Sequence, residues 1–213
     1  MINVFIADDH DIVRDGVKRI LESFPDMKVV GEAGNGHDTI SLCKNVKFDV
    51  LLLDLDMPDL GGLEVVGTMK AMLPGSRILI LTMHDNEEYA KRALKEGADG
   101  YILKGSSPGE LPAAVRKVAE GKNYISPAIM EKIVLQQCSK HGENPLSALS
   151  TRELQILSRL ARHKKIREIA DDLNLSISTV NTYKSRLVKK LNIEGRADMM
   201  RFAEKHNLSD VNL

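Results

Sequence analysis

The sequence has few cysteines, no long apolar run and no net charge, and each absence excludes a class of protein. Cys43 and Cys138 are the two cysteines, and they show neither metal-site nor disulfide-framework spacing, so we expect them to be reduced. No apolar run approaches the ~20 residues of a membrane span. Asp8 and Asp9 interrupt the first apolar stretch, which argues against a secretory signal. We therefore expect a cytoplasmic protein without membrane association.

The zero net charge conceals two halves of opposite sign. Residues 1–122 contain 15 basic and 20 acidic residues, whereas residues 123–213 contain 15 basic and 10 acidic residues. The length of 213 residues allows one large or two small domains, and the charge asymmetry favours two. We predict one domain at 1–122, a linker with a short helix at 123–144, and a second domain at 145–210.

The first half alternates apolar runs with segments of helical periodicity. The runs lie at 4–7, 28–31, 50–53, 77–81 and 100–103, and the helical segments at about 11–23, 37–46, 62–73, 86–96 and 108–119. Three runs, Val4–Ala7, Val50–Leu53 and Ile78–Leu81, are continuously apolar, which is typical of strands buried on both faces of a parallel sheet. The alternation predicts an α/β fold with a doubly wound, five-stranded parallel sheet.

Chemically active side chains follow the predicted strands. Asp8 and Asp9 end the first strand, Asp54 the third, Thr82 the fourth and Lys104 the fifth. A single acid in such a place is often only a cap or turn former, but all five groups would meet at the carboxyl edge of the sheet, where open α/β sheets bind ligands. Crowded carboxylates need a cation, and hard oxygen ligands suit Mg²⁺. A lysine and a hydroxyl beside Mg²⁺ suit a phosphoryl group.

These residues carry a resemblance to the receiver domain of two-component response regulators. The matching stretches are "ADDH" at 7–10, "LLLDLDMPDLGGLE" at 51–64, "LTMHD" at 81–85 and "GYILK" at 100–104. The resemblance implies a flavodoxin-like strand order of 2-1-3-4-5. It implies that Asp54 accepts a phosphoryl group from a sensor histidine kinase, that Lys104 pairs with the phosphate, and that Thr82 and Tyr101 form a switch pair.

The same resemblance implies how a magnesium ion is held. Asp9 and Asp54 would bind Mg²⁺ directly, together with the backbone carbonyl of Asp56, and Asp8 would act through water. In this interpretation the protein is not an enzyme. At most it supports Mg²⁺-dependent phosphorylation and dephosphorylation of itself.

The second half is purely helical in pattern. Ser150 and Glu153 form a predicted capping box at the start of its first helix. A helix over about Ile166–Leu173, a turn at 174–176, and a helix from residue 177 or 178 to about Leu191 together predict a helix-turn-helix. A fourth helix is predicted over Arg196–His206.

The second helix of this motif has a polar, basic face. Residues 151–190 hold ten basic and four acidic residues, which is either a solvated surface or a nucleic-acid footprint. Helical spacing places Val180, Leu187 and Leu191 in the core. We predict that short polar residues on the outer face contact base edges and that long cations contact phosphates. The predicted DNA contacts are Asn181, Thr182, Lys184, Ser185, Arg186, Lys189 and Lys190.

This half resembles the LuxR-type DNA-binding domain through "LSTRELQIL" at 149–157 and "IREIADDLNLSISTVNTYKSRLVKKLNI" at 166–193. Both halves in this order resemble the NarL/FixJ class, and "TVNTYKSRLVKKLNI" at 179–193 is most similar to its GacA/UvrY branch. The resemblance implies a homodimer, formed on phosphorylation, that binds an inverted repeat in double-stranded promoter DNA. RNA polymerase is a further candidate partner. His163 and Tyr183 depart from the usual pattern, so a base preference cannot be transferred.

Two other functions fit parts of the sequence. Asp54-Leu55-Asp56 is similar to the DxD motif of haloacid-dehalogenase-type phosphatases, but that motif ends a first strand, whereas here it ends a third. A phosphorylation-independent regulator, with the first domain kept only for dimerisation, would not need the complete set of acids, Thr82 and Lys104. The sequence therefore predicts a phosphorylation-gated transcription regulator.

Overall fold

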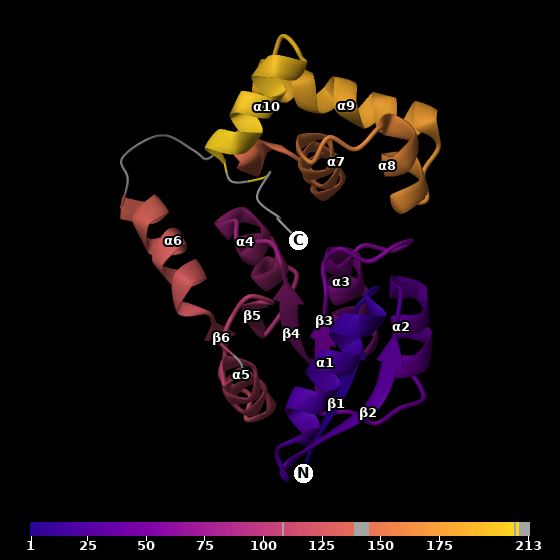
Figure 1. The fold of residues 1–213 in the computed structure, drawn as a ribbon, viewed down its shortest axis with the longest axis vertical. Coiled ribbons are helices and arrows are strands. Elements are labelled where there is room, and N and C mark those ends of the chain that lie inside the picture. Colours follow the sequence, from indigo (N-terminus) through magenta and orange to yellow (C-terminus); the bar gives the residue numbers. More distant parts are fainter. Residues whose placement is uncertain (108, 139–144, 207, 209–213) are drawn as a thin grey trace. The chain divides into compact units, whose positions relative to one another are not determined.

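The computed structural model describes residues 1–107, 109–138, 145–206 and 208 (Figure 1). The chain forms two compact units, and the first comprises Met1–Met83 and Tyr89–Met130. The predicted domain limits of 1–122, 123–144 and 145–210 stay predictions. Residues 108, 139–144, 207 and 209–210 of those ranges lie outside the described residues.

The first unit contains a parallel sheet with the strand order β2-β1-β3-β4-β5-β6. Every neighbouring pair of strands is parallel. The strands are β1 (Ile2–Ala7), β2 (Met27–Ala33), β3 (Val50–Leu53), β4 (Arg77–Thr82), β5 (Gly100–Leu103) and β6 (Tyr124–Ile125). The predicted α/β class, parallel sheet and order of the first five strands are confirmed. The structure adds β6, whose two residues are too few to show a periodic pattern.

Helices connect the strands and bury both faces of the sheet. They are α1 (Asp11–Glu22), α2 (Gly36–Cys43), α3 (Gly62–Met72), α4 (Glu87–Lys95) and α5 (Glu110–Ala119). Alternate strand residues such as Val4 and Leu52 pack with residues of α1 and α5 in one cluster. The residues between them, such as Phe5 and Leu51, are also fully buried. Because successive strand side chains point to opposite faces, this burial pattern defines a doubly wound sheet.

A charged network closes the end of the sheet opposite the candidate site. Asp99 accepts hydrogen bonds from Lys70 Nζ at 2.8 Å, from Arg77 Nη1 at 3.0 Å and from the Ile78 N–H at 2.9 Å. Burial alone would raise the pKa of the Asp99 carboxyl, but these donors together lower it. The network therefore ties α3 to the starts of β4 and β5.

We expect Asp99→Ala to lower the free energy of unfolding of the first unit by about 2 kcal/mol, since it removes hydrogen bonds to a charged group. A lowered folded-state pKa means that the stabilisation is present above the unfolded value of about 3.9 and is lost as pH falls through the folded value. The wild type should thus lose stability below about pH 4. Asp99→Ala should not show the part of this loss that is due to protonation of Asp99. Hydrogen exchange of β4 and β5 at increasing urea concentration measures the free energy of unfolding at each pH. Asp15→Ala is the control, because Asp15 is exposed. Equal stability of Asp99→Ala and wild type would contradict the assignment.

The second unit contains the helices that follow α6, and α6 itself begins in the first unit. The chain continues from β6 into α6 (Pro127–Cys138), and after a short 3-10 helix (Pro145–Ala148) come α7 (Thr151–Ala161), α8 (Ile166–Asp172), α9 (Ile177–Leu191) and α10 (Arg196–Lys205). The predicted capping box is confirmed, because Ser150 Oγ accepts from the Glu153 N–H and Glu153 accepts from the Ser150 N–H. Among the helices in the described part of the chain, none combines the length and apolarity needed to span a membrane.

Candidate functional site

An acidic cluster lies at the carboxyl ends of β1 and β3. Asp8 follows β1 and Asp54 follows β3, and the Asp54 N–H donates to the Ala7 carbonyl at 2.8 Å, which holds the two strand ends together. One ligand atom each from Asp8, Asp9, His10 and Asp54 lie within 4.8 Å of one another. Asp8 and Asp54 are 2% and 3% exposed, so their charges are poorly screened by water.

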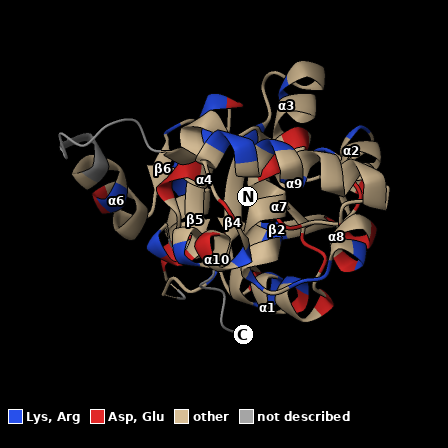
Figure 2. Cartoon of the chain, turned by 90° about the horizontal axis from the view of Figure 1, so that it is seen from above, with Lys and Arg blue, Asp and Glu red and all other residues tan. Residues whose placement is uncertain are grey.

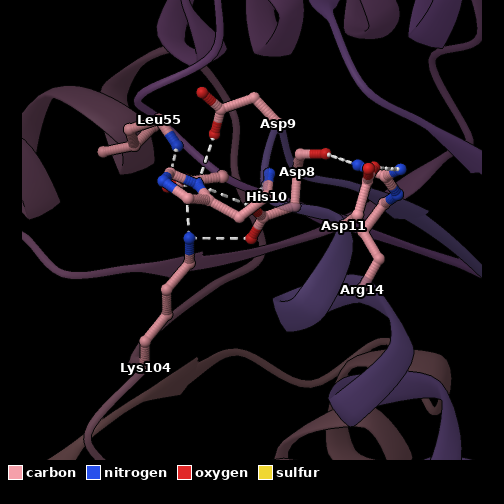
Figure 3. Close-up of polar contacts among 8 residues, drawn as sticks. Asp8, Asp9, His10, Asp11, Arg14, Leu55 and Lys104 are labelled. Carbon is pink, nitrogen blue, oxygen red and sulfur yellow. Dashed lines mark hydrogen bonds and ion pairs between the residues drawn. The ribbon is translucent and has the colours of Figure 1, made fainter.

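Lys104 bridges two of these acids from the end of β5. Its Nζ lies 2.7 Å from Asp8 Oδ2 and 2.7 Å from Asp54 Oδ2 (Figure 3). Burial alone would lower the pKa of Lys104, but the charges and hydrogen bonds of Asp54 and Asp8 raise it. Lys104 is therefore held as an ammonium beside the predicted phosphoryl acceptor.

The Asp54 carboxylate is fixed in orientation by two donors. The Leu55 N–H donates to Oδ1 at 2.6 Å, and Lys104 donates to Oδ2 at 2.7 Å. Gly62 makes this arrangement possible, because a Cβ at that position would lie 2.3 Å from the Asp54 carbonyl oxygen. Gly62 is not among the predicted site residues; the signal that could have pointed to it is the pair Gly61-Gly62, which is typical of a turn.

The site carries excess negative charge. Burial is the largest factor that raises the pKa of Asp54, and the nearby Asp56 and Asp8 raise it further against the opposing effect of Lys104. Burial also raises the pKa of Asp9; His10 opposes this, and Asp54 and Asp8 add to it. Three carboxylates and one ammonium leave a formal charge of −2, which one divalent cation would neutralise. The oxygen donors therefore fit Mg²⁺ in both chemistry and charge.

The other predicted receiver residues occupy neighbouring positions. Thr82 ends β4 and is fully buried, and its carbonyl accepts from the Lys104 N–H at 2.9 Å. Tyr101, on the adjacent strand, is also fully buried. Asp56 lies half-buried in the loop after β3. The structure thus brings the three acids and Lys104 into one site and places Thr82, Tyr101 and Asp56 on the strand ends and loop that border it.

Two residues near the acids had no predicted role. Arg14 Nη1 donates to the Asp8 carbonyl at 2.6 Å, which fixes the backbone at the end of β1. His10 Nδ1 lies 2.6 Å from Asp9 Oδ1. The signal for His10 was its place directly after two acids, whereas no sequence pattern pointed to Arg14.

The second unit presents the predicted recognition helix, α9. Ser176 caps it by accepting from the Thr179 N–H at 3.1 Å, and Val180 and Leu187 are fully buried, as predicted. Helix α9 contains four Lys and Arg residues and no Asp or Glu (Figure 2). Most predicted DNA contacts are exposed, namely Asn181, Thr182, Ser185, Arg186, Lys189 and Lys190, and Lys184 is half-buried.

Lys190 has a partner inside its own unit. Its Nζ lies 2.7 Å from Glu153 Oε2, and the Glu153 side chain is 3% exposed. The Lys190 ammonium and the Ser150 N–H together lower the pKa of Glu153, although burial alone would raise it. This contact favours a structural role for Lys190, which joins the start of α7 to the end of α9, over the phosphate contact that the sequence predicted.

Two families match the chain, one in each half. The family described as "Response regulator receiver domain" matches residues 4–116, and the family described as "Bacterial regulatory proteins, luxR family" matches residues 147–203. The chain therefore belongs to the response regulators that join a receiver domain to a LuxR-type DNA-binding domain. A protein of this class is not a classical enzyme.

Individual relatives match the chain over nearly its whole length. Response regulator UvrY of Escherichia coli (strain K12) is 40% identical over 212 residues, covering 99% of this chain and 97% of UvrY. Response regulator GacA of Pseudomonas aeruginosa is 37% identical over 213 residues, covering 99% of each chain. The predicted resemblance to this branch is confirmed.

A solved structure is similar over the whole chain as well. RcsB of Salmonella enterica serovar Typhimurium, bound to the promoter P1flhDC in the presence of the phosphomimetic BeF₃⁻, has a TM-score of 0.72 and 29% identity, and the match covers 99% of both chains.

Proposed function

We propose that this protein is a transcription regulator whose receiver domain accepts a phosphoryl group on Asp54 and thereby controls DNA binding by α9. The observation that carries the proposal is the Asp54 carboxylate, 3% exposed and held between the Leu55 N–H and Lys104 beside two further acids. A buried carboxylate with fixed orientation and an adjacent ammonium suits attack on a phosphoryl group.

The phosphoryl donor is a sensor histidine kinase or a small phosphodonor. An Asp54 oxygen forms the new bond to phosphorus, and the bond from phosphorus to the donor atom, a histidine nitrogen in the kinase, breaks. Lys104 moves from the Asp54 oxygen to an oxygen of the bound phosphoryl group. Asp9, Asp54 and the backbone carbonyl of Asp56 would hold Mg²⁺ directly, with Asp8 acting through water, and the ion would neutralise charge on the phosphoryl oxygens. Self-dephosphorylation would be hydrolysis at the same site.

A comparison with the phosphatase alternative supports this assignment. Asp54 follows β3, which lies inside the sheet between β1 and β4, rather than a first strand. Lys104, directly after β5, contacts Asp54, and Thr82 ends the neighbouring strand β4. These are the residues expected around a phosphoryl acceptor. Turnover of a small phosphate ester, a true phosphatase activity, would overturn the proposal.

In Lys104→Ala, acceptance of a phosphoryl group should no longer be followed by the full increase in DNA affinity. Because Lys104 spans Asp8 and Asp54 at 2.7 Å from each, it can sense a phosphoryl group added to Asp54. We expect the variant to accept phosphate but to lose about tenfold or more of the phosphorylation-induced gain in DNA affinity. Thr82→Ala, which removes the switch hydroxyl, should behave similarly.

Fluorescence anisotropy on selected DNA, before and after treatment with acetyl phosphate, measures this coupling. Lys122→Ala is the control, because that exposed lysine pairs with Glu120 on the surface. If Lys104→Ala and Thr82→Ala both gain DNA affinity as the wild type does, the coupling role is wrong.

We further propose that the active form is a homodimer on an inverted repeat, as one recognition helix reads only a few base pairs. Met199 and Ala203 of α10 are buried within the chain, whereas Met200 and Phe202 are half-buried and are therefore our candidates for the dimer contact. The promoter-bound structure of RcsB supports DNA as the partner. RNA polymerase is a further partner in this proposal, and the cytoplasm is the proposed location.

Analytical ultracentrifugation of the phosphorylated protein on DNA with one inverted repeat tests the dimer. We expect two protein chains per DNA, and Met200→Asp or Phe202→Asp should reduce the complex to a weak one-chain form. A one-to-one complex of the wild type at saturation would refute the dimer.

A further inference from the structure

The second unit contains a cavity that has no part in the phosphoryl transfer proposed above. Its volume is about 380 Å³, which lies in the range of pockets that hold small molecules. Its walls come from the end of α7, the segment 163–165, one face of α9 and the start of α10. Helix α7 packs against both α9 and α10 (Figure 1), so these walls belong to one packed group of helices.

Apolar side chains from three helices form part of the cavity wall. They are Leu160 of α7, Val188 of α9, and Met199 and Met200 of α10. Leu160, Val188 and Met200 are only half-buried. A molecule with an apolar body would cover this surface, and the burial of apolar area would be the main favourable contribution to its binding.

Cationic side chains line the same cavity without being neutralised. Lys165, Lys184 and Arg196 form no ion pair within the residues that the structure describes, whereas Lys164 is paired with Asp172. Among the described residues of the cavity wall, Glu194 is the one acid. The three unpaired cations and this acid leave a formal charge of +2, which favours an anionic ligand.

The geometry of α9 separates the cavity from the predicted base contacts. At about 100° per residue, Lys184 and Val188 lie about 160° and 120° around the helix from Thr182, which is exposed on the outer face. DNA bound against the outer face would therefore leave the cavity unfilled. This placement favours a role for Lys184 in the cavity over the phosphate contact that the sequence predicted.

The start of α10 adds backbone donors to the cavity. Gly195 and Arg196 both line it, and Gly195 is the N-cap residue, so no side chain caps the helix there. A Cβ at Gly195 would meet no other atom within 4 Å, so the backbone is open to a ligand. The first N–H groups of a helix have no partner within the helix, and together with the helix dipole they favour an anionic group.

We propose that this cavity binds a small carboxylic acid with a compact apolar body. The carboxylate lies between Lys165, Arg196 and the start of α10, and the apolar body contacts Val188 and Met199. A singly charged carboxylate suits the site better than a phosphate dianion, because Glu194 repels a dianion more strongly. Binding needs neither phosphorylation nor DNA, so the inference goes beyond the proposed function and can fail without it.

NMR spectroscopy of the full-length protein with isotope-labelled methionine methyl groups tests the inference, with naphthoate as the probe. Met199 and Met200 line the cavity, so their methyl resonances report binding there. Met57 and Met69 are fully buried in the first unit and report binding elsewhere. Naphthamide, which has nearly the same shape but no charge, shows how much of the affinity depends on the carboxylate.

Removal of the cations should weaken binding of the acid. We expect the double variant Lys165→Ala/Arg196→Ala to bind naphthoate about tenfold more weakly than the wild type, because it removes two charged donors. Both side chains are exposed, so the variant should stay folded. Arg201→Ala is the matched control and should bind like the wild type, because Arg201 lies on the same helix but pairs with Asp198.

A larger side chain in the cavity should exclude the acid. We expect Val188→Phe to abolish the naphthoate-induced shifts of Met199 and Met200, and we expect naphthamide to bind the wild type about tenfold more weakly than naphthoate does. The inference is wrong if millimolar naphthoate leaves the Met199 and Met200 resonances of the wild type unmoved. It is also wrong if naphthamide binds as tightly as naphthoate, or if the double variant binds naphthoate as tightly as Arg201→Ala.

Discussion

Asp54→Asn should abolish phosphorylation of the protein by acetyl phosphate in the presence of Mg²⁺. The amide that replaces the carboxylate is a poor nucleophile, and it removes the negative charge that faces Lys104 at 2.7 Å. Chelation of Mg²⁺ should abolish labelling of the wild type as well. Without a cation, the carboxylates of the site would repel the incoming phosphoryl dianion. The mass of the intact protein before and after treatment gives the extent of labelling.

Asp59→Asn is the matched control for this experiment. Asp59 lies in the same loop, and its φ of 67° is one that asparagine adopts readily, so the backbone should tolerate the change. We expect Asp59→Asn to be labelled like the wild type. Labelling of Asp54→Asn under native conditions would show that another residue is the acceptor.

The second large effect is expected on α9, where sequence preference and general affinity should depend on different residues. Asn181→Ala and Thr182→Ala should change which DNA sequences bind, because each removes a base contact, which contributes about 1–3 kcal/mol of discrimination where it is bidentate, as an Asn side chain allows. The Thr182 hydroxyl donates to the Ser178 carbonyl at 3.0 Å, so its oxygen is left to accept from a base. Lys189→Ala should weaken all sequences alike and lower the log–log salt slope by about one.

Binding of each variant to a randomised DNA library at two salt concentrations separates these effects. Lys190→Ala extends the series, because its ion pair with Glu153 predicts a decrease in the thermal stability of the second unit rather than a change of salt slope. The assignment of base contacts to Asn181 and Thr182 and of a phosphate contact to Lys189 would be wrong if the preference shifted in Lys189→Ala but stayed unchanged in the other two variants.

The fold was predictable because its signals are repeated along the chain. Val4–Ala7, Val50–Leu53 and Ile78–Leu81 are apolar at every position, and burial on both faces of a parallel sheet is the direct physical cause. β6 was not predicted, because its two residues owe their conformation to pairing with Gly100 and Tyr101 and not to a pattern of their own.

The site was predictable where it depends on strand ends and not where it depends on side-chain geometry. Asp8, Asp54 and Lys104 converge because parallel strands end at one edge of the sheet. Lys190 was predicted to contact a phosphate because it is a long cation, but its side chain reaches back to a buried glutamate, which no sequence pattern reveals. The close approach of Gly62 to Asp54 likewise depends on the path of a loop and not on a local pattern.

Genome-wide DNA occupancy of the wild type and of Asp54→Asn, at equal protein levels and in cells that phosphorylate the protein, tests the central proposal most directly. If phosphorylation of Asp54 gates DNA binding, the wild type should occupy a set of promoters that share an inverted repeat, and Asp54→Asn should lose most of that occupancy. Equal occupancy of the same promoters by both proteins would contradict the account.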